Sequence, residues 1–567
     1  QISRFMKKLK SNCTPARELD AVRNYIEVED ELRMATSTII GRKDVILDQV
    51  SKILWTQVFP EFDPNSLVCR HGPGITAERY GSNERYTIRK WPTRSELLFP
   101  ADLHAFPNYW EASGPAGGGS SCPGLDFLDV GEEPAVRVVF VPKTLKAPRV
   151  IAIEPSHMQY MQQGLMAHVV SVLESHRLTK RSVRFSDQSV NQRLAHRSSI
   201  DRRLATLDLK DASDRVHLAL VQRIFRSTTL LEYLEDCRSL HAILPNGRNV
   251  ILSKFASMGS ALCFPVEAMV FYTLLQAAMH SQDGRRPTTR SIEQYSRTID
   301  IYGDDLIVPV EYVDTIVATL EDYSLKVNVR KSFRYSQFRE SCGGDYFAGT
   351  DVKPVYLREI PLDQRRAWTA STCMSLAATS DQFYLKGLWK TAQCIRDMLQ
   401  EGSKTPIPRS RRPGAGLRFH SLLFDTNCRY NSNLHRYEQR RIKYEPIRKS
   451  DHIDGQGLPC LSKWGISTVF QRGALEGSPS WVHGNHQAER QSNHRGTSIF
   501  GSLPSVVSGS ESFDSSPNAA QRQTERLLSH YGLLAKLHGN PVEGTSLDFD
   551  SSVKRGCFKQ KSRWIAC

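Results

Sequence analysis

The residues with the clearest chemical potential are two adjacent aspartates, Asp304 and Asp305, which follow Tyr302 and Gly303. They lie within TIDIYGDDLIVPV (298–310), whose apolar runs predict two short β-strands joined by a tight turn. Carboxylates side by side at such a hairpin tip repel each other unless a cation neutralises them. Hard oxygen ligands at this density suit Mg²⁺. A bare Gly-Asp-Asp tripeptide is more often a solvated turn, so a metal site requires further carboxylates nearby.

A second group of carboxylates follows the apolar run ATLDL (205–209), which predicts a buried strand. Asp208 ends this run, and Asp211 and Asp214 come just beyond it. If this strand neighbours the hairpin in one sheet, Asp208 and Asp304 meet at the same edge. Two Mg²⁺ ions, for which Mn²⁺ can substitute, would lie about 3.5–4 Å apart there and promote an in-line displacement that releases pyrophosphate. Taken alone, Asp211 or Asp214 more often lies at a helix N-terminus or in a loop.

Two further segments suit a nucleotide. VPKTLKAPRVIAIEP (141–155) carries Lys143, Lys146 and Arg149, and cations spaced along a loop can hold a triphosphate. SMGS (257–260) precedes a helical pattern and offers hydroxyls, backbone N–H groups and a glycine that permits close approach. Alone, the first segment would more often be an ordinary exposed loop and the second a helix N-cap. The predicted nucleotide-binding residues are Lys143, Lys146, Arg149, Asp214, Ser257 and Gly259.

The elements that must position these residues alternate along the chain. Residues 261–279 are apolar, but Pro265, Glu267 and Gln276 interrupt them, so they predict a buried helix and not a membrane span. The full order predicts an α+β fold with helices on one face of an antiparallel sheet. The predicted strands are 135–142, 150–153, 205–209, the hairpin 298–310 and KVNV (326–329) with RKSF after it, and the predicted helices are 158–173, 261–279 and 313–323.

Composition bounds the class of protein. The chain has 567 residues and a formal net charge of +15, which favours a polyanionic partner because Lys and Arg release the counterions of phosphates. Its twelve cysteines include no C-x-x-C pair, so neither a zinc ribbon nor a disulfide framework is indicated. The N-terminus is basic without an apolar core and lacks an initiating Met, so we expect no signal peptide and a fragment or processed product.

The C-terminal part has a different composition. After about residue 360 the pattern is mainly helical, and residues 401–450 hold 12 Lys and Arg against 4 Asp and Glu. We expect RNA contact there, through Arg409, Arg411 and Arg412. Residues 473–518 are rich in Ser, Gly, Asn and His, which is typical of loops or disorder, and the Gly/Ser segment 111–124 predicts a boundary or flexible loop.

In this order the segments resemble the palm of viral RNA-dependent RNA polymerases. The chain looks specifically like the replicase catalytic subunit of leviviruses, the positive-strand RNA bacteriophages of the Q-beta and MS2 type. The resemblance runs from about residue 135 to 358, and FRESCGGDYFAGTDVKPVYLR (338–358) is far more specific than Gly-Asp-Asp. It also covers VPKTLKAPRVIAIEP, TLDLKDASD (206–214), SMGSALCFPVE (257–267), IYGDDLIVP (301–309) and VNVRKSF (327–333).

The resemblance implies RNA synthesis from NTPs on an RNA template, replicating a phage genome in the cytoplasm of an infected bacterium. It places Asp208 in the first palm motif, Asp304 and Asp305 in the third, and Lys331 as general acid to pyrophosphate. It implies assembly with the host elongation factors Tu and Ts and a small-subunit ribosomal protein, and no membrane. The implied right-hand layout is fingers in 1–134 and 135–200, palm in 201–360, a helical basic thumb in 361–472 and a partly disordered tail in 473–567.

The sequence departs from the family after Ser257-Met258-Gly259, where Asn-Gly and a later Thr are expected. Ser260, Ala261 and Cys263 stand there instead, which puts in doubt how that loop handles the ribose and template. One alternative is a reverse transcriptase, against which Gly303 and the string at 338–358 argue. The other is a non-catalytic basic RNA-binding or capsid protein, which predicts no metal dependence.

Overall fold

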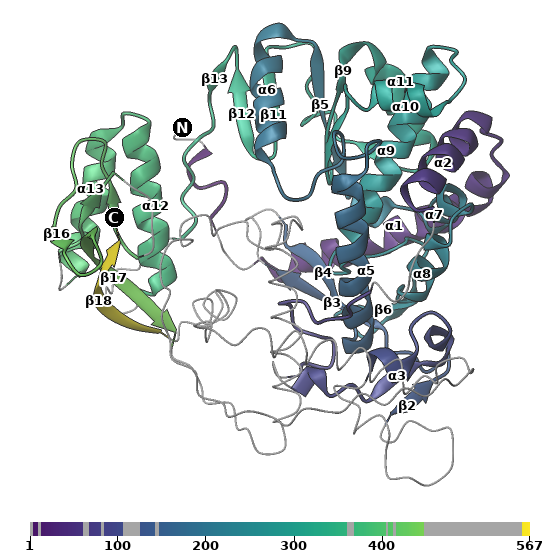
Figure 1. Ribbon diagram of the computed structural model, residues 1–567, viewed down its shortest axis with the longest axis horizontal. Helices are drawn as coiled ribbons and strands as arrows, with labels where there is room; N and C mark the ends of the chain where they lie inside the picture. Colours follow the sequence, from purple (N-terminus) through teal and green to yellow (C-terminus); the bar gives the residue numbers. More distant parts are fainter. Residues whose placement is uncertain are drawn as a thin grey trace, which may run out of the picture.

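The computed structural model describes residues 4–9, 13–60, 67–80, 84–105, 125–141, 147–359, 368–403, 406–411, 416–446 and 558–566. The predicted residues Lys143, Lys146 and Arg412, and the segments 111–124 and 473–518, lie outside this description. Figure 1 shows the elements in two groups, a large one that holds α1 to α11 and a smaller one with α12, α13 and β16 to β18.

The sheet that matters for the chemistry has four antiparallel strands in the order β10-β5-β9-β8. Both of its faces are covered: α6 packs on one side, and α9 and α11 lie on the other (Figure 1). The expectation of helices on one face only was wrong, because the strands are apolar at consecutive positions: Leu207 is 3% exposed and Thr206, facing the other way, 2%. The bounds are β5 (Leu204–Lys210), β8 (Asp300–Tyr302), β9 (Asp305–Pro309), β10 (Lys326–Val327), α6 (Ser189–Asp201), α9 (Cys263–Gln282) and α11 (Val313–Asp322).

Helix α9 is the centre of the main core. Its side chains are buried on all sides from Cys263 to His280, apart from Phe264, which is partly buried, so the predicted buried helix is confirmed. Its polar residues are satisfied within the protein, since Trp55 donates to Thr273 and Gln276 donates to the carbonyl of Ile292. No helix in the described residues is long and apolar enough to cross a membrane. Around α9 pack α2 (Val45–Val58), α5 (Ser156–Ser175), α7 (Leu218–Phe225) and α10 (Thr289–Tyr295).

A second four-stranded sheet, in the order β4-β3-β6-β7, lies against the N-terminal helix α1 (Pro15–Gly41). Val22 and Tyr25 of α1 share a buried cluster with Val136, Val138 and Ala152 of this sheet. The predicted strands at 135–142 and 150–153 are thereby confirmed. The strands are β3 (Val136–Val141), β4 (Arg149–Ile153), β6 (His241–Ile243) and β7 (Asn249–Ile251).

A three-stranded antiparallel sheet, β11-β12-β13, packs on α6 beside the central sheet. Its strands are β11 (Phe338–Ser341), β12 (Gly344–Phe347) and β13 (Thr350–Asp351), all within the string that carries the family resemblance. The remaining elements of the large group are α3 (Ala101–His104), α8 (Leu230–Asp236), β1 (Lys90–Pro92) and β2 (Asp126–Leu128).

The region after residue 360 is less helical than the sequence indicated. Two helices, α12 (Ala370–Leu385) and α13 (Trp389–Gly402), are followed only by strands, and β17 (Arg436–Pro446) pairs with β18 (Phe558–Ala566) over its C-terminal nine residues. The prediction missed these strands because the partner of β17 lies more than 100 residues further along the chain, beyond any local pattern. The other strands are β14 (Arg409–Ser410), β15 (Phe419–His420) and β16 (Cys428–Asn431).

Candidate active site

The hairpin predicted from Tyr302-Gly303-Asp304-Asp305 is present, with β8 and β9 paired antiparallel and Tyr302 opposite Asp305. Gly303 forms the tip in the left-handed region, at φ +59°. A Cβ atom there would lie 2.1 Å from Cε2 of Phe264, so both the backbone and the packing require glycine. The turn therefore fixes where the carboxylate of Asp304 projects.

The two predicted carboxylate groups meet, because β5 and β9 are neighbours with Asp208 opposite Asp305. The carboxylate of Asp208 accepts hydrogen bonds from Asn328 Nδ2 at 2.9 Å and from Lys331 Nζ at 3.1 and 3.2 Å. Lys331 does not lie in a strand as expected, since β10 ends at Val327 and Lys331 belongs to the turn after it. That turn folds the lysine back onto Asp208, where a cation would compete with its ammonium group.

Asp304 and Asp305 have different surroundings. Asp304 lines a cleft, whereas Asp305 accepts a hydrogen bond from the backbone N–H of Cys342 at 3.1 Å. Burial, and then the charge of Asp304, raise the pKa of Asp305 to about 7. Asp305 is therefore held beneath the tip, and Asp304 faces the open space.

The cleft beside the hairpin tip has a volume of about 730 Å³. Glu267 of α9 enters it from below, and burial followed by the charges of Asp304 and Asp214 raises the pKa of Glu267 well above its usual range. The cations that line it are Arg17, Arg149, Lys210 and Lys331. Its carboxylates are Asp20, Asp208, Asp211, Asp214, Glu267 and Asp304.

This donor set suits a hard divalent cation in chemistry. Asp211 adopts the left-handed conformation at φ +51°, and its buried Oδ2 has no hydrogen-bond partner. Within the described residues, no three or more His, Cys, Asp and Glu side chains are already arranged to hold a metal ion. Mg²⁺ commonly binds through one or two carboxylates plus water and substrate phosphates, so the carboxylates of Asp208 and Asp304 fit it without a closed protein cage.

The predicted nucleotide-binding residues separate into two sets. Arg149, Asp214 and Gly259 line the cleft, whereas the hydroxyl of Ser257 is buried behind it, 2.9 Å from Tyr25 Oη. Gly259 is required by its neighbour in the fold, because a Cβ atom would lie 1.9 Å from the carbonyl oxygen of Ala152 in β4. The Ser257–Ser260 turn therefore packs on the strand that begins with Arg149.

Sequence reasoning missed a buried lysine beside this cleft. Lys254 has a fully buried side chain whose Nζ lies 2.8 Å from Asp214 Oδ1 and 3.2 Å from Glu29 Oε1. It also lies 3.6 Å from the ring centroid of Tyr25. The one local signal is a lysine surrounded by apolar residues in ILSKFA (251–256), which departs from an ordinary exposed lysine.

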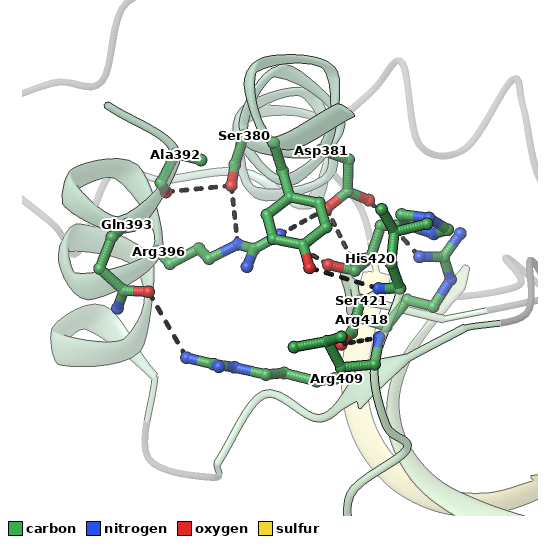
Figure 2. Close-up of polar contacts among 12 residues, drawn as sticks. Ser380, Asp381, Ala392, Gln393, Arg396, Arg409, Arg418, His420 and Ser421 are labelled. Carbon is green, nitrogen blue, oxygen red and sulfur yellow. Dashed lines mark hydrogen bonds and ion pairs between the residues drawn. The ribbon is translucent and has the colours of Figure 1, made fainter. Parts of the chain in front are cut away.

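The residues predicted to contact RNA lie away from the cleft, in the smaller group of elements. Figure 2 shows Arg409 extending toward Gln393 of α13, with an Nη2–Oε1 distance of 3.4 Å. Arg411 forms an ion pair with Asp425 at 3.2 Å, with its side chain 59% exposed. Beside Arg409, the carboxylate of Asp381 receives Arg396 and the backbone N–H of His420, so part of the local basic charge is already paired.

Comparisons with known proteins agree with the resemblance. Residues 129–367 match the family model described as RNA replicase, beta-chain. The chain is 36% identical over 226 residues to the RNA-directed RNA polymerase beta chain of Escherichia phage MS2, covering 40% of this chain and 38% of that protein. It is 35% identical over 225 residues to the RNA-directed RNA polymerase subunit beta of Escherichia virus Qbeta, covering 40% and 36%. The predicted resemblance to leviviral replicases is therefore confirmed for the central region.

The match spans less than two fifths of the length of these relatives. Among solved structures, the RNA-dependent RNA polymerase of a human picorbirnavirus aligns with 13% identity and a TM-score of 0.34, covering 48% of this chain and 56% of that one. The polymerase of BmCPV in its elongation state aligns with 10% identity and a TM-score of 0.34, covering 49% and 27%.

Proposed function

We propose that this chain is an RNA-directed RNA polymerase that transfers nucleotides from NTPs to the 3′-end of RNA on an RNA template. The observation that carries the proposal is the β5–β9 register, which places Asp208 beside the Asp304 hairpin on an open cleft. This arrangement falls within the residues that match the replicase family model. Replication of a phage genome follows from the names of the relatives.

Asp208 and Asp304 are the residues that would hold two Mg²⁺ ions, with Asp305 orienting the tip from beneath. Bound Mg²⁺ supplies activation of the attacking hydroxyl and neutralisation of the leaving pyrophosphate. Arg149 lies on the cleft where it can pair with a triphosphate. Burial lowers the pKa of Lys331, but the adjacent carboxylate of Asp208 more than offsets this and leaves the pKa raised, which keeps the ammonium protonated for proton donation to pyrophosphate.

The same proposal assigns the elements to a right hand. The central sheet with its hairpin, in 201–360, is the palm, and the sheet β4-β3-β6-β7 with the N-terminal elements builds the fingers. The group after residue 361, with α12 and α13, is the thumb. We also propose that host elongation factors Tu and Ts and a small-subunit ribosomal protein assemble with the chain. Purification of the chain from bacteria under gentle conditions tests this, and a fully active polymerase with no host protein attached would contradict it.

Primer extension with the purified chain tests the activity. Labelled NTP should be incorporated on a primed RNA template with Mg²⁺ and not with excess chelator. Asp208→Asn and Asp304→Asn should each lower the rate by several powers of ten, and Asp305→Asn by less. Asp314→Asn is the matched control, because that side chain is 83% exposed on α11 and does not line the cleft.

Three results would contradict the proposal. Near-wild-type extension by a folded Asp208→Asn or Asp304→Asn variant would refute the site, and preference for dNTP would favour a reverse transcriptase. RNA binding without any metal-dependent synthesis would favour a non-catalytic RNA-binding protein.

A further inference from the structure

A buried ion cluster joins the N-terminal helix to the cleft. Lys254 lies between β7 and α9, and its side chain is 0% exposed. Its ammonium group contacts Asp214, Glu29 and the face of the Tyr25 ring. Tyr25 and Glu29 are one turn apart on α1, so one face of α1 surrounds the ammonium group opposite Asp214.

The cluster is anchored at both ends by the backbone. Glu29 Oε2 accepts a hydrogen bond from the N–H of Ser253 at 2.6 Å, and Arg238 donates to the carbonyl of Lys254 at 3.0 Å. Tyr25 Oη lies 2.9 Å from Ser257 Oγ. The position of the lysine is therefore determined by α1 and by the segment before α9 together.

The charges show that the lysine remains an ammonium ion. Burial alone lowers the pKa of Lys254, but the carboxylate of Asp214, the Tyr25 ring and Glu29 outweigh it and leave the pKa above its ordinary value. A buried ion pair is a weak means of stabilising a fold, because the desolvation of both charges offsets most of their attraction. Holding one particular carboxylate in place is a role that an apolar side chain could not perform.

Asp214 is the member of the cluster that reaches the cleft. Its side chain is 22% exposed and lines the cleft together with Asp208 and Asp304. Lys254 engages Oδ1, and no hydrogen bond reaches Oδ2 from the residues that the structure describes. One oxygen is thus fixed and the other is available to accept a hydrogen bond from a bound molecule.

We propose that Lys254, with Tyr25 and Glu29, is a positioning residue that fixes Asp214 so that Oδ2 accepts a hydrogen bond from the ribose of the incoming nucleotide, and thereby selects NTP over dNTP. The inference rests on the proposed polymerase function. A ribose 2′-hydroxyl is the group that distinguishes the two nucleotides, and a carboxylate oxygen accepts a hydrogen bond from it directly. A site built to bond a hydroxyl discriminates against the analogue that lacks it.

The chain offers a matched control in Lys326. This residue also bridges to α1, with Nζ 2.8 Å from Glu31 Oε2, but its side chain is 49% exposed and it does not line the cleft. Lys326→Met therefore removes a lysine bridge to the same helix without touching Asp214. If only the docking of α1 mattered, the two lysine variants would behave alike.

The experiment measures kcat/KM for ATP and for 2′-deoxyATP in single-nucleotide extension by the full chain on an RNA template. Lys254→Met should lower the ratio of the two values by about ten- to a hundredfold, mainly through loss with ATP, because a hydrogen bond to a charged group is misplaced. Lys326→Met should leave the ratio at the wild-type value. Asp214→Asn should show the same loss as Lys254→Met, and the double variant should show no further loss.

A second variant protects the test against misfolding. Lys254→Met combined with Glu29→Gln leaves no unpaired charge at Glu29 and keeps an acceptor for the Ser253 N–H. A wild-type ratio in either folded Lys254 variant, or an equal fall in Lys326→Met, would overturn the inference while the polymerase proposal stands. A wild-type chain that incorporates no nucleotide would overturn the proposed function itself, and the inference with it.

Discussion

Replacing Gly303 by alanine should both destabilise the protein and stop synthesis, for a reason that the hairpin makes quantitative. The left-handed backbone at φ +59° disfavours any L-residue by about 1–2 kcal/mol. The new Cβ atom would also lie 2.1 Å from Cε2 and 2.9 Å from Cδ2 and Cζ of Phe264, and overpacking of this kind costs about 1–3 kcal/mol. We therefore expect the free energy of unfolding to fall by about 2–5 kcal/mol.

The turn glycine Gly247 separates the two contributions. It has φ +83°, but no heavy atom lies within 4 Å of a Cβ atom placed on it. Gly247→Ala should therefore cost only the backbone part, about 1–2 kcal/mol. Denaturant unfolding followed by circular dichroism gives both values, and primer extension should fall at least tenfold for Gly303→Ala alone, because Asp304 moves with the tip.

A double-mutant cycle with Phe264→Ala identifies the clash directly. Phe264 packs edge-on against Phe185 and Tyr302, so its removal destabilises the wild type, yet it should be milder in the Gly303→Ala background by about 1–3 kcal/mol. The reasoning is refuted if Gly303→Ala and Gly247→Ala are equally destabilised, or if the cycle shows no coupling between Gly303 and Phe264.

Three further predictions test other parts of the molecule. Lys331→Leu should slow single-turnover nucleotide addition by about 10²–10⁴-fold with little change in RNA affinity, and an unchanged rate would leave Lys331 without a role in the chemistry. Replacing Arg409, Arg411 and Arg412 with glutamine should weaken RNA binding and lower the log–log salt slope by nearly one unit per lost phosphate contact, whereas a wild-type slope would contradict RNA contact there. Burial raises the pKa of Glu154 from 4.5 to about 7, so its ionisation destabilises the fold progressively as pH rises from 4.5 to 7. Glu154→Gln should accordingly be more stable than wild type by on the order of 3 kcal/mol at pH 8 and about 1 kcal/mol at pH 5, and a pH-independent difference between the two unfolding curves would contradict this.

Local patterns predicted the elements that carry the carboxylates. Apolar runs and turn residues placed β5, β8, β9 and α9 within a few residues of their observed bounds, because burial on a sheet or within a helix bundle leaves a periodic pattern. The different environments of Asp304 and Asp305 also follow from a local rule, since adjacent side chains on a turn diverge. What the pattern could not supply is the Cys342 N–H that holds Asp305, because that contact joins two separate hairpins.

The contacts that sequence reasoning missed are those between distant segments. Lys254 meets Tyr25 and Glu29 across more than 220 residues of chain, and β17 meets β18 across more than 110. No periodicity encodes such pairs, because each partner satisfies its own local pattern equally well as a surface residue. A lysine within an apolar run was the available signal, and it indicates burial without naming a partner.

The position of α1 bears on how much of the chain the chemistry requires. The replicase family model begins at residue 129, yet α1, which lies wholly before it, lines the cleft through Arg17, Asp20 and Asn24. The same helix binds the segment between Asp208 and α9 at several points, since Glu31 pairs with Arg215 at 2.8 Å and Thr36 lies 3.1 Å from Nε2 of His217. These contacts fix the turn that follows Asp208 and the lysine that holds Asp214. The unit that builds the cleft is therefore the matched region together with α1, and the region of sequence similarity by itself contains the carboxylates without part of the structure that orients them.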